Sequence, residues 1–281
     1  MKTSYMWIDP GLPNDHLITG LSMPLDEALS ALKIFGFDGI ELMIGNPINF
    51  EAEIFEQKVR EYGLSISQIC TGELYGSYGL MLNHPDSSMR KKSLYVCEDI
   101  IKMAAHWRCT VSIGRFRGKL WDSDPKASIE IMAESLKYLN DVANAEDAYI
   151  LLEPLRLDIC DTLNTVDETT NFIRVWGLNR FGWLLDTDHV DFGQVESIQR
   201  EAHSLGFVHL ADSQHNPLGR GKIRIENYIA LLASIKYQGY CSVEVFSDLG
   251  MNQINFLSEM ADKLSAYFSI SNLKKGNNHA D

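Results

Sequence analysis

The sequence predicts an α/β protein with a single (β/α)8 TIM barrel. Short runs rich in β-branched and aromatic residues alternate with amphipathic stretches of helical period, a pattern typical of parallel sheets covered by helices. Eight such units fit in a chain of 281 residues, close to the roughly 250 residues of one barrel. An open doubly wound sheet is the alternative, but it usually carries a glycine-rich phosphate loop after an early strand, and the chain shows none.

The later strand-like runs are continuously apolar, as expected for parallel strands that are buried on both faces. The predicted strands are Ser4–Ile8, Gly39–Ile44, Ser65–Cys70, Thr110–Gly114, Tyr149–Glu153, Phe181–Asp186, Phe207–Leu210 and Ser242–Phe246. The stretches between and after them repeat apolar residues at helical spacing. The predicted helices are Leu25–Phe35, Phe50–Tyr62, Ser88–Trp107, Ser128–Ala145, Val166–Trp176, Gln194–Ser204, Ile225–Tyr237 and Gln253–Ile270.

Composition limits the classes of partner and the location. One barrel domain is expected over residues 1–270, followed by a polar tail at 271–281 without periodicity, which we expect to be disordered. The net charge of −13 disfavours a nucleic-acid partner, because such proteins present basic surface. No apolar run is long enough for a membrane span. The five cysteines are scattered and lack paired spacing. This pattern favours free thiols in a reducing compartment, and hence a cytoplasmic protein.

Four polar residues stand where strand-like runs end in the second half of the chain. They are Glu153, Asp186, His209 and Glu244, at successive separations of 33, 23 and 35 residues. Catalytic groups of barrel enzymes lie at the C-terminal ends of several strands, so these side chains are expected to converge at one face. A single acidic residue at such a position is often only a helix cap or an ion-pair partner, but four on consecutive strands favour a site.

Three carboxylates and one imidazole are suitable ligands for a divalent metal ion. Mn²⁺, Mg²⁺ and Co²⁺ suit this oxygen-rich set, and Zn²⁺ fits it as well. Such an ion would polarise a carbonyl and stabilise a developing enediolate. Glu153 and Glu244 lie on opposite sides of the predicted site and are candidates for an acid/base pair. Return of the proton to the opposite face gives epimerisation, and transfer to the adjacent carbon gives aldose–ketose isomerisation.

Several stretches resemble the xylose-isomerase-like barrel family of sugar and sugar-phosphate isomerases and epimerases. They are ICTGELYGSYGLMLNHPDSSMRKKSL, VSIGRFRG, LLEPLRLDICDTLNT, WLLDTDHV and FVHLADSQHNPLGRG. The likeness runs from about Gly39 to Phe246, and the nearest branch resembles the ketose and keto-acid 3-epimerases of the D-tagatose 3-epimerase and 5-keto-L-gluconate epimerase type. The resemblance implies a small carbohydrate substrate, a manganese-type metal centre and a homodimer or homotetramer.

The resemblance also implies roles for individual residues. The ligands of one divalent metal ion would be Glu153, Asp186, His209 and Glu244, with the two glutamates also moving protons. His189, in the element DTDH, resembles the family histidine that contacts substrate oxygens near the metal, although it could instead cap the following helix.

The chain departs from the family pattern where the substrate is held. Arg156 stands where the epimerases have asparagine, Ile159 where they have a second glutamate, and His215 where an arginine is usual. In ketohexose epimerases these groups hold the first carbons of the substrate. The departures therefore predict a substrate other than a plain ketohexose, or poor activity on one.

Arginines predicted near the mouth suggest an anionic keto sugar, such as a sugar acid or phosphate, because guanidinium groups bind these anions bidentately. Arg115 and Arg117 follow the fourth strand, Arg156 the fifth, and Arg220 lies after the seventh. The alternative is that they pair with nearby acids such as Glu73. The residues expected to bind substrate are His189, His215, Arg156, Arg117 and Arg220.

Three other functions remain open from the sequence. A lyase on the same scaffold, like inosose dehydratase or the C-glycoside-cleaving enzymes, would share proton abstraction beside a carbonyl. A DNA-repair role like that of endonuclease IV needs further histidines after the third, fourth and seventh strands, which are missing here. A non-catalytic barrel is consistent with the altered substrate residues but not with the intact metal set.

Overall fold

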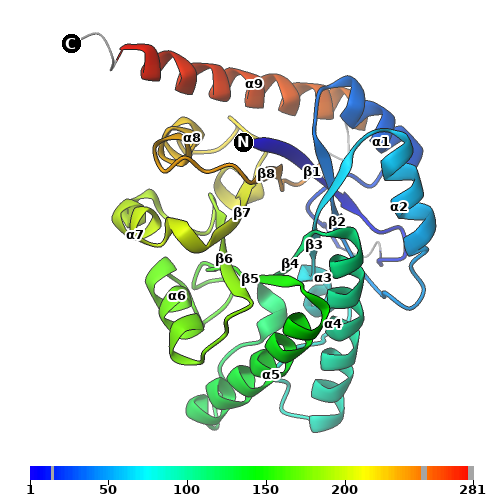
Figure 1. Cartoon of the computed structure of the whole chain (residues 1–281), viewed down its shortest axis with the longest axis vertical. Helices are drawn as coiled ribbons and strands as arrows, with labels where there is room; N and C mark the ends of the chain where they lie inside the picture. The colour runs from blue at the N-terminus through cyan, green and yellow to red at the C-terminus, as the bar shows by residue number, and fades with distance from the viewer. Residues whose placement is uncertain (14–15, 248–251, 278–281) are drawn as a thin grey trace.

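The computed structural model describes residues 1–13, 16–247 and 252–277, with side chains through residue 269. In this part of the chain eight parallel strands follow one another in sequence order, and β8 pairs with β1 to close the barrel. Figure 1 shows the strands at the centre with helices around them, and the C-terminal helix α9 running past α8 and α1. The predicted (β/α)8 barrel is confirmed.

The strands begin and end close to the predicted positions. They are β1 (Lys2–Ile8), β2 (Gly39–Met43), β3 (Ser65–Cys70), β4 (Thr110–Ile113), β5 (Tyr149–Leu152), β6 (Phe181–Asp186), β7 (Leu205–Leu210) and β8 (Tyr240–Val243). Glu153 and Glu244 therefore stand one residue beyond β5 and β8, whereas Asp186 ends β6 and His209 lies inside β7. All four are at the C-terminal end of the barrel.

The helices cover the outside of the barrel. They are α1 (Leu25–Ile34), α2 (Ala52–Glu61), α3 (Gly72–Gly76), α4 (Ser87–Trp107), α5 (Pro125–Glu146), α6 (Val166–Val175), α7 (Val195–Arg200), α8 (Ile225–Ser234) and α9 (Gln253–Asn277). Short 3-10 turns are η1 (Arg115–Arg117), η2 (Phe192–Gln194), η3 (Ala202–Ser204) and η4 (Ser213–His215). The single helix predicted over 194–204 is wrong, because that segment is divided into α7 and parts of η2 and η3.

Local sequence explains why several helices begin where they do. Thr165 accepts a hydrogen bond from the backbone N–H of Glu168, and the Glu168 side chain accepts one from Thr165, which forms a capping box at the start of α6. At α5, Asp124 caps the helix and Pro125 occupies the first turn, where its missing N–H costs nothing. Such local signals make these helix starts readable from sequence.

The C-terminal segment differs from the expectation of a disordered tail from residue 271. Helix α9 continues to Asn277, and residues 278–281 lie outside the described part of the chain. Among the described helices none is long and apolar enough to cross a membrane. All five cysteines are buried free thiols.

The interior of the barrel contains two small apolar groups and several fully buried polar residues. One apolar group lies toward the catalytic end and contains Met6, Leu12, Met43 and Cys70. A second lies toward the N-terminal ends of the strands and contains Leu151, Leu184 and Phe207. Fully buried polar residues of the strands are Ser4, Glu41, Gln68, Asp186, His209 and Ser242. Burying polar groups costs free energy unless they are paired. These residues are therefore expected to have partners or a function inside the barrel.

Candidate active site and metal centre

The structure brings the four strand-end residues together. Glu153, Asp186, His209 and Glu244 each offer one ligand atom, and these atoms all lie within 4.8 Å of one another. The four residues are buried, with exposed fractions of 7, 0, 0 and 8%. We refer to them as the carboxylate–histidine cluster. Two atoms bound to one ion at about 2.0–2.2 Å stand no more than about 4.4 Å apart, so only a slight adjustment would gather them on one ion.

Atoms of the cluster lack hydrogen-bond partners in a way that fits a metal ion. Glu153 Oε1, Asp186 Oδ2 and His209 Nδ1 are buried and have none among the described residues. His209 Nδ1 lies 2.6 Å from Glu244 Oε2, 3.6 Å from Glu153 Oε1 and 3.8 Å from Asp186 Oδ2. The shortest of these contacts is not aligned as a hydrogen bond. Buried carboxylate and imidazole atoms that converge without aligned hydrogen bonds are what a cation stabilises.

The other nitrogen of His209 is held by a carboxylate. His209 Nε2 lies 2.9 Å from Glu41 Oε1, and Gln68 Nε2 donates to the same oxygen at 2.8 Å. Because β7 and β2 are not neighbours in the barrel, this contact crosses the barrel interior. Metal-binding histidines typically donate their second N–H to a carboxylate, which fixes the ring and its tautomer. Glu41 therefore directs Nδ1 toward the cluster.

The carboxylates of the cluster are also positioned by neighbours. Asp186 Oδ1 accepts the backbone N–H of Asp188 at 2.6 Å and that of His189 at 3.2 Å, which leaves Oδ2 for the cluster. Glu244 Oε1 accepts the hydroxyl of Thr19 at 3.0 Å. A Cβ at Gly114 would stand 2.4 Å from a carboxylate oxygen of Glu153, so that position requires glycine.

Opposite charges shift the pKa values within the cluster. Burial by itself would lower the pKa of His209, but Glu244 and Glu41 outweigh it and hold that pKa well above the ordinary value. Burial would likewise raise the pKa of Glu244, but His209 and His215 hold it well below the ordinary value. Without a metal ion, the raised pKa of His209 and the lowered pKa of Glu244 favour an imidazolium beside a carboxylate, and a metal ion would displace the proton of His209.

A pocket of about 170 Å³ opens above the cluster. Its polar lining includes Glu153, Glu244, His189, His215, Glu73 and Arg115, and its apolar lining includes Leu17, Ile18, Met43, Leu155, Ile159 and Phe246. The volume lies below the range of about 300–1,000 Å³ for drug-sized ligands, which suits a substrate of monosaccharide size.

A larger hollow of about 510 Å³ lies at the opposite end of the barrel. Its lining includes the first residues of four strands, Lys2, Ser65, Thr110 and Tyr240. The cluster residues are not among the described residues that line it. Barrel enzymes carry their chemistry at the C-terminal ends of the strands, so the smaller pocket is the candidate active site.

Two of the residues predicted to bind substrate line this pocket. His189 and His215 face each other with ring centroids 5.0 Å apart. His215 Nε2 lies 3.3 Å from Asp186 Oδ2 and 3.8 Å from Glu244 Oε2. His189 Nδ1 is buried and has no hydrogen-bond partner. Both imidazoles are therefore at the edge of the cluster.

The three arginines predicted to bind substrate are not among the described residues that line this pocket. Arg117 is fully buried and donates to the backbone carbonyls of Gly114, Glu153, Thr162 and Leu163. It supports the segment that carries Glu153. Arg220 pairs with Glu259 on α9 at 2.7 Å.

Arg156 and Arg115 have carboxylate partners as well. Arg156 Nη1 lies 2.7 Å from both oxygens of Asp188. Arg115 does line the pocket, but it lies 2.9 Å from the buried carboxylate of Glu73. Pairing of these arginines with neighbouring acids, the alternative considered from sequence, is what the structure shows.

Some contributing residues had little signal in the sequence. Glu41 lies in the apolar run GIELM, and an acidic residue inside a buried strand is the one hint of its role. Thr19 belongs to a loop that precedes α1, and no pattern marks it. Asp188 was recognisable only as part of DTDH, without the partners that the fold gives it.

Comparisons with known proteins identify the family of the chain. The pattern described as xylose isomerase-like TIM barrel matches residues 29–265. The chain belongs to this family. A ketose 3-epimerase of Arthrobacter globiformis is 24% identical over 222 residues, which cover 75% of this chain and 74% of that protein. A D-psicose 3-epimerase of Ruminiclostridium cellulolyticum is 27% identical and covers 76% of each chain.

A solved structure of an L-ribulose 3-epimerase superimposes with a TM-score of 0.81 at 17% identity, covering 100% of this chain and 99% of that one. This likeness concerns the fold. The family resemblance seen in the sequence is confirmed, and the named relatives support an enzyme of the isomerase class, a sugar epimerase.

Proposed function

We propose that the protein is a divalent-metal-dependent epimerase of keto sugars that uses Glu153 and Glu244 as its acid/base pair. The observation that carries the proposal is their convergence from β5 and β8 on one imidazole. Glu153 Oε1 and Glu244 Oε2 lie 3.6 and 2.6 Å from His209 Nδ1. Two carboxylates that arrive from different strands at one buried point are suited to exchange a proton with opposite faces of a small substrate.

The ligands of the metal ion would be Glu153, Asp186, His209 and Glu244. When bound, the ion supplies charge that polarises the substrate carbonyl and favours loss of the neighbouring proton. The oxygen-rich donors suit Mn²⁺, Mg²⁺ or Co²⁺. The fit rests on Glu153 Oε1, Asp186 Oδ2 and His209 Nδ1, which are buried without hydrogen-bond partners in the described part of the chain.

The protein side chains divide the remaining work. One glutamate removes the proton beside the carbonyl and the other returns it from the opposite side. Thr19 donates to Glu244 Oε1 and so fixes the direction of that carboxylate. Gly114 leaves room for Glu153, whose oxygen would otherwise meet a side chain. His189 lines the pocket and can donate to a hydroxyl of the sugar, and His215 lines it beside the cluster.

A neutral keto sugar is the substrate form that the pocket supports best. Among the described lining residues the one guanidinium is that of Arg115, and Glu73 already compensates its charge at 2.9 Å. A carboxylate or phosphate on the substrate would have to compete with that buried acid. Ile159 stands in the lining where the related epimerases have a glutamate, so one end of the sugar meets an apolar wall.

The proposal is tested by incubating the protein with neutral ketoses in D₂O with Mn²⁺, Co²⁺ or Mg²⁺ and following deuterium incorporation by NMR. We expect exchange at one carbon beside the carbonyl, together with a new epimer, and loss of exchange in Glu153→Gln and Glu244→Gln. Sugar phosphates and keto-sugar acids should react more slowly than the neutral ketose.

Two outcomes would contradict the proposal. Exchange that survives in both glutamine variants would remove the acid/base assignment. Release of water or of an aglycone with each exchange would show a lyase on the same scaffold. The cytoplasmic location and the homodimer or homotetramer expected from sequence stay predictions, which fractionation and analytical ultracentrifugation would address.

A further inference from the structure

We infer that His215 is a fifth protein ligand of the metal centre, held in place by Asp188 and Arg156, so that the centre carries two imidazoles. The inference rests on the metal centre of the proposed function, because it adds a ligand to that same ion. It also gives a common reason for Arg156 and His215, two positions where the sequence departs from the epimerase pattern.

The first argument is the position of the His215 ring. Its Nε2 lies 3.3 Å from Asp186 Oδ2 and 3.8 Å from Glu244 Oε2. Both distances are below the span of about 4.4 Å that two ligands of one ion can have. Among the described residues Asp186 Oδ2 has no aligned hydrogen-bond donor. The imidazole therefore stands where a further ligand of the cluster would stand.

The second argument is the support of the opposite ring nitrogen. His215 Nδ1 lies 3.0 Å from Asp188 Oδ2. Asp188 in turn receives Arg156 Nη1 at 2.7 Å on both oxygens and the backbone N–H of Gln214 at 2.7 Å. A carboxylate on the far nitrogen is the usual second partner of a metal-binding histidine.

The same arrangement occurs at the other histidine of the centre. There Glu41 contacts His209 Nε2 at 2.9 Å and is itself held by Gln68 at 2.8 Å. His209 thus faces the carboxylates of the cluster with Nδ1, and His215 faces them with Nε2. In each ring the other nitrogen contacts a supporting carboxylate. Each has a buried or nearly buried side chain, with 0 and 12% exposed.

The third argument is the backbone of the loop after β7. Gln214 and His215 both have positive φ, 61° and 52°, in the left-handed region that residues other than glycine rarely adopt. His215 is tied to the end of β8 by a hydrogen bond from the Phe246 N–H to its carbonyl at 2.9 Å. Strain of this kind persists where surrounding contacts impose it, typically at functional sites. Here it aims an imidazole at the cluster.

A second imidazole has a consequence for the choice of metal. Carboxylates suit Mg²⁺ and Mn²⁺, whereas imidazoles favour later transition metals, and affinity rises from Mn²⁺ to Co²⁺ at nitrogen-containing sites. We therefore expect the ratio of Co²⁺ affinity to Mn²⁺ affinity to be larger than in a centre whose one imidazole is His209. Removing His215 should reduce that preference.

The experiment measures binding of Co²⁺ alone and Mn²⁺ alone to chelator-treated protein by calorimetry, with the visible spectrum of the Co²⁺ form as a second readout. We expect His215→Ala to weaken Co²⁺ binding more than about 10-fold, to weaken Mn²⁺ binding less, and to change the spectrum. Asp188→Asn should weaken Co²⁺ binding about 10-fold, as expected for the support of a ligand.

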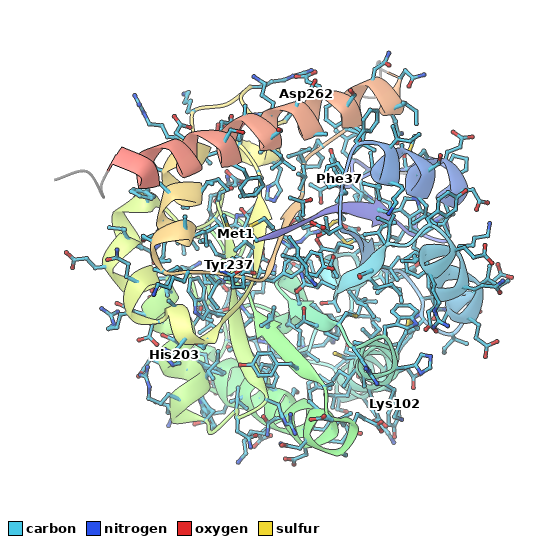
Figure 2. All side chains as sticks on the ribbon, turned by 45° about the horizontal axis from the view of Figure 1, so that its top comes forward. Met1, Phe37, Lys102, His203, Tyr237 and Asp262 are labelled. Atoms are coloured by element: carbon cyan, nitrogen blue, oxygen red, sulfur yellow. The ribbon has the colours of Figure 1, made fainter. Side chains whose placement is uncertain are left out.

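The matched control is His203→Ala, because His203 is exposed on η3 before β7. Figure 2 shows it at the margin of the molecule. We expect the control to bind both ions like the parent. Unchanged Co²⁺ affinity and spectrum in His215→Ala would overturn the inference and leave the proposed function standing. Failure of the parent to bind either ion would instead overturn the metal centre of the proposed function.

A measurement on the unaltered protein avoids any folding defect of the variants. Pulsed EPR of the Cu²⁺-loaded parent counts the bound imidazoles. Two imidazoles on one ion per chain support the inference, and one imidazole overturns it. Two ions per chain, the second bound by Asp186, His189 and His215, would overturn it too, because His215 would then serve a separate site.

Discussion

Replacement of Arg117 distinguishes a structural role from the substrate contact that the sequence suggested. In Arg117→Met, the carbonyls of Glu153 and Thr162 lose the guanidinium that donates to them. A buried carbonyl without a donor costs about 1–3 kcal/mol, so two cost about 4 kcal/mol. Gly114 O is not counted, because it also accepts the Arg117 backbone N–H at 3.1 Å.

Removal of the buried charge offsets part of this cost. Burial lowers the pKa of Arg117, which shows that the charged form is disfavoured where it stands. We therefore expect a net loss of about 3 kcal/mol in the free energy of unfolding. For a chain of this size the melting temperature falls by about 2 °C per kcal/mol, hence by about 6 °C. Thermal unfolding followed by circular dichroism measures the change.

The matched control is Arg220→Met, the same chemical change at another arginine of the predicted set. Its pair with Glu259 is about one-third exposed on each side, and such a pair contributes about 0–1 kcal/mol. Arg220 also stands over the Phe256 ring at 5.9 Å, and we expect the control to lose less stability than Arg117→Met. A variant Arg117→Met that melts like the control, with a raised KM and unchanged kcat, would refute the structural role and restore the substrate contact.

Three further predictions concern the cluster. Gly114→Ala should lower kcat about 100-fold, because the new Cβ would displace Glu153 and a misplacement of about 1 Å costs that much. The control Gly72→Ala should keep its activity, because its Cβ would meet its nearest neighbour at 3.8 Å. Equal activities of the two variants would argue against a tight fit at Gly114. Glu41→Gln should weaken Mn²⁺ binding about 10-fold in calorimetry by loosening His209, and unchanged binding would exclude the orienting role. Metal affinity should rise with pH, because the pKa of metal-free His209 is raised and its proton must leave on binding. Titrations in buffers of different ionisation enthalpy should show about one proton released, and equal affinity at pH 6 and pH 8 would contradict this.

The strand pattern was readable from sequence because each strand of a parallel barrel is a local apolar run bounded by helix signals. The four cluster residues were readable for a related reason, since each stands at the end of such a run. Closure of the barrel then brings strand ends together whatever the intervening helices are. Spacing along the chain was therefore enough to predict their convergence.

Side-chain partners outside the strand ends depended on contacts between distant segments. Arg117 and Arg115 are two residues apart, yet one is buried against carbonyls of the loop after β5 and the other lines the pocket against Glu73. The sequence pattern places both arginines in the segment after β4 and does not distinguish the directions of their side chains. Only the turn η1 decides which side chain points inward.

The sequence by itself determined the (β/α)8 barrel and the carboxylate–histidine cluster, because both follow from periodicity and from where apolar runs end. The tertiary structure alone decided which cations are compensated and which imidazoles reach the cluster. Glu41 contacts a histidine 168 positions away, and Arg156 reaches His215 only through Asp188. Such pairings depend on the path of loops across the barrel mouth and on the direction of each side chain, and neither is encoded in local periodicity.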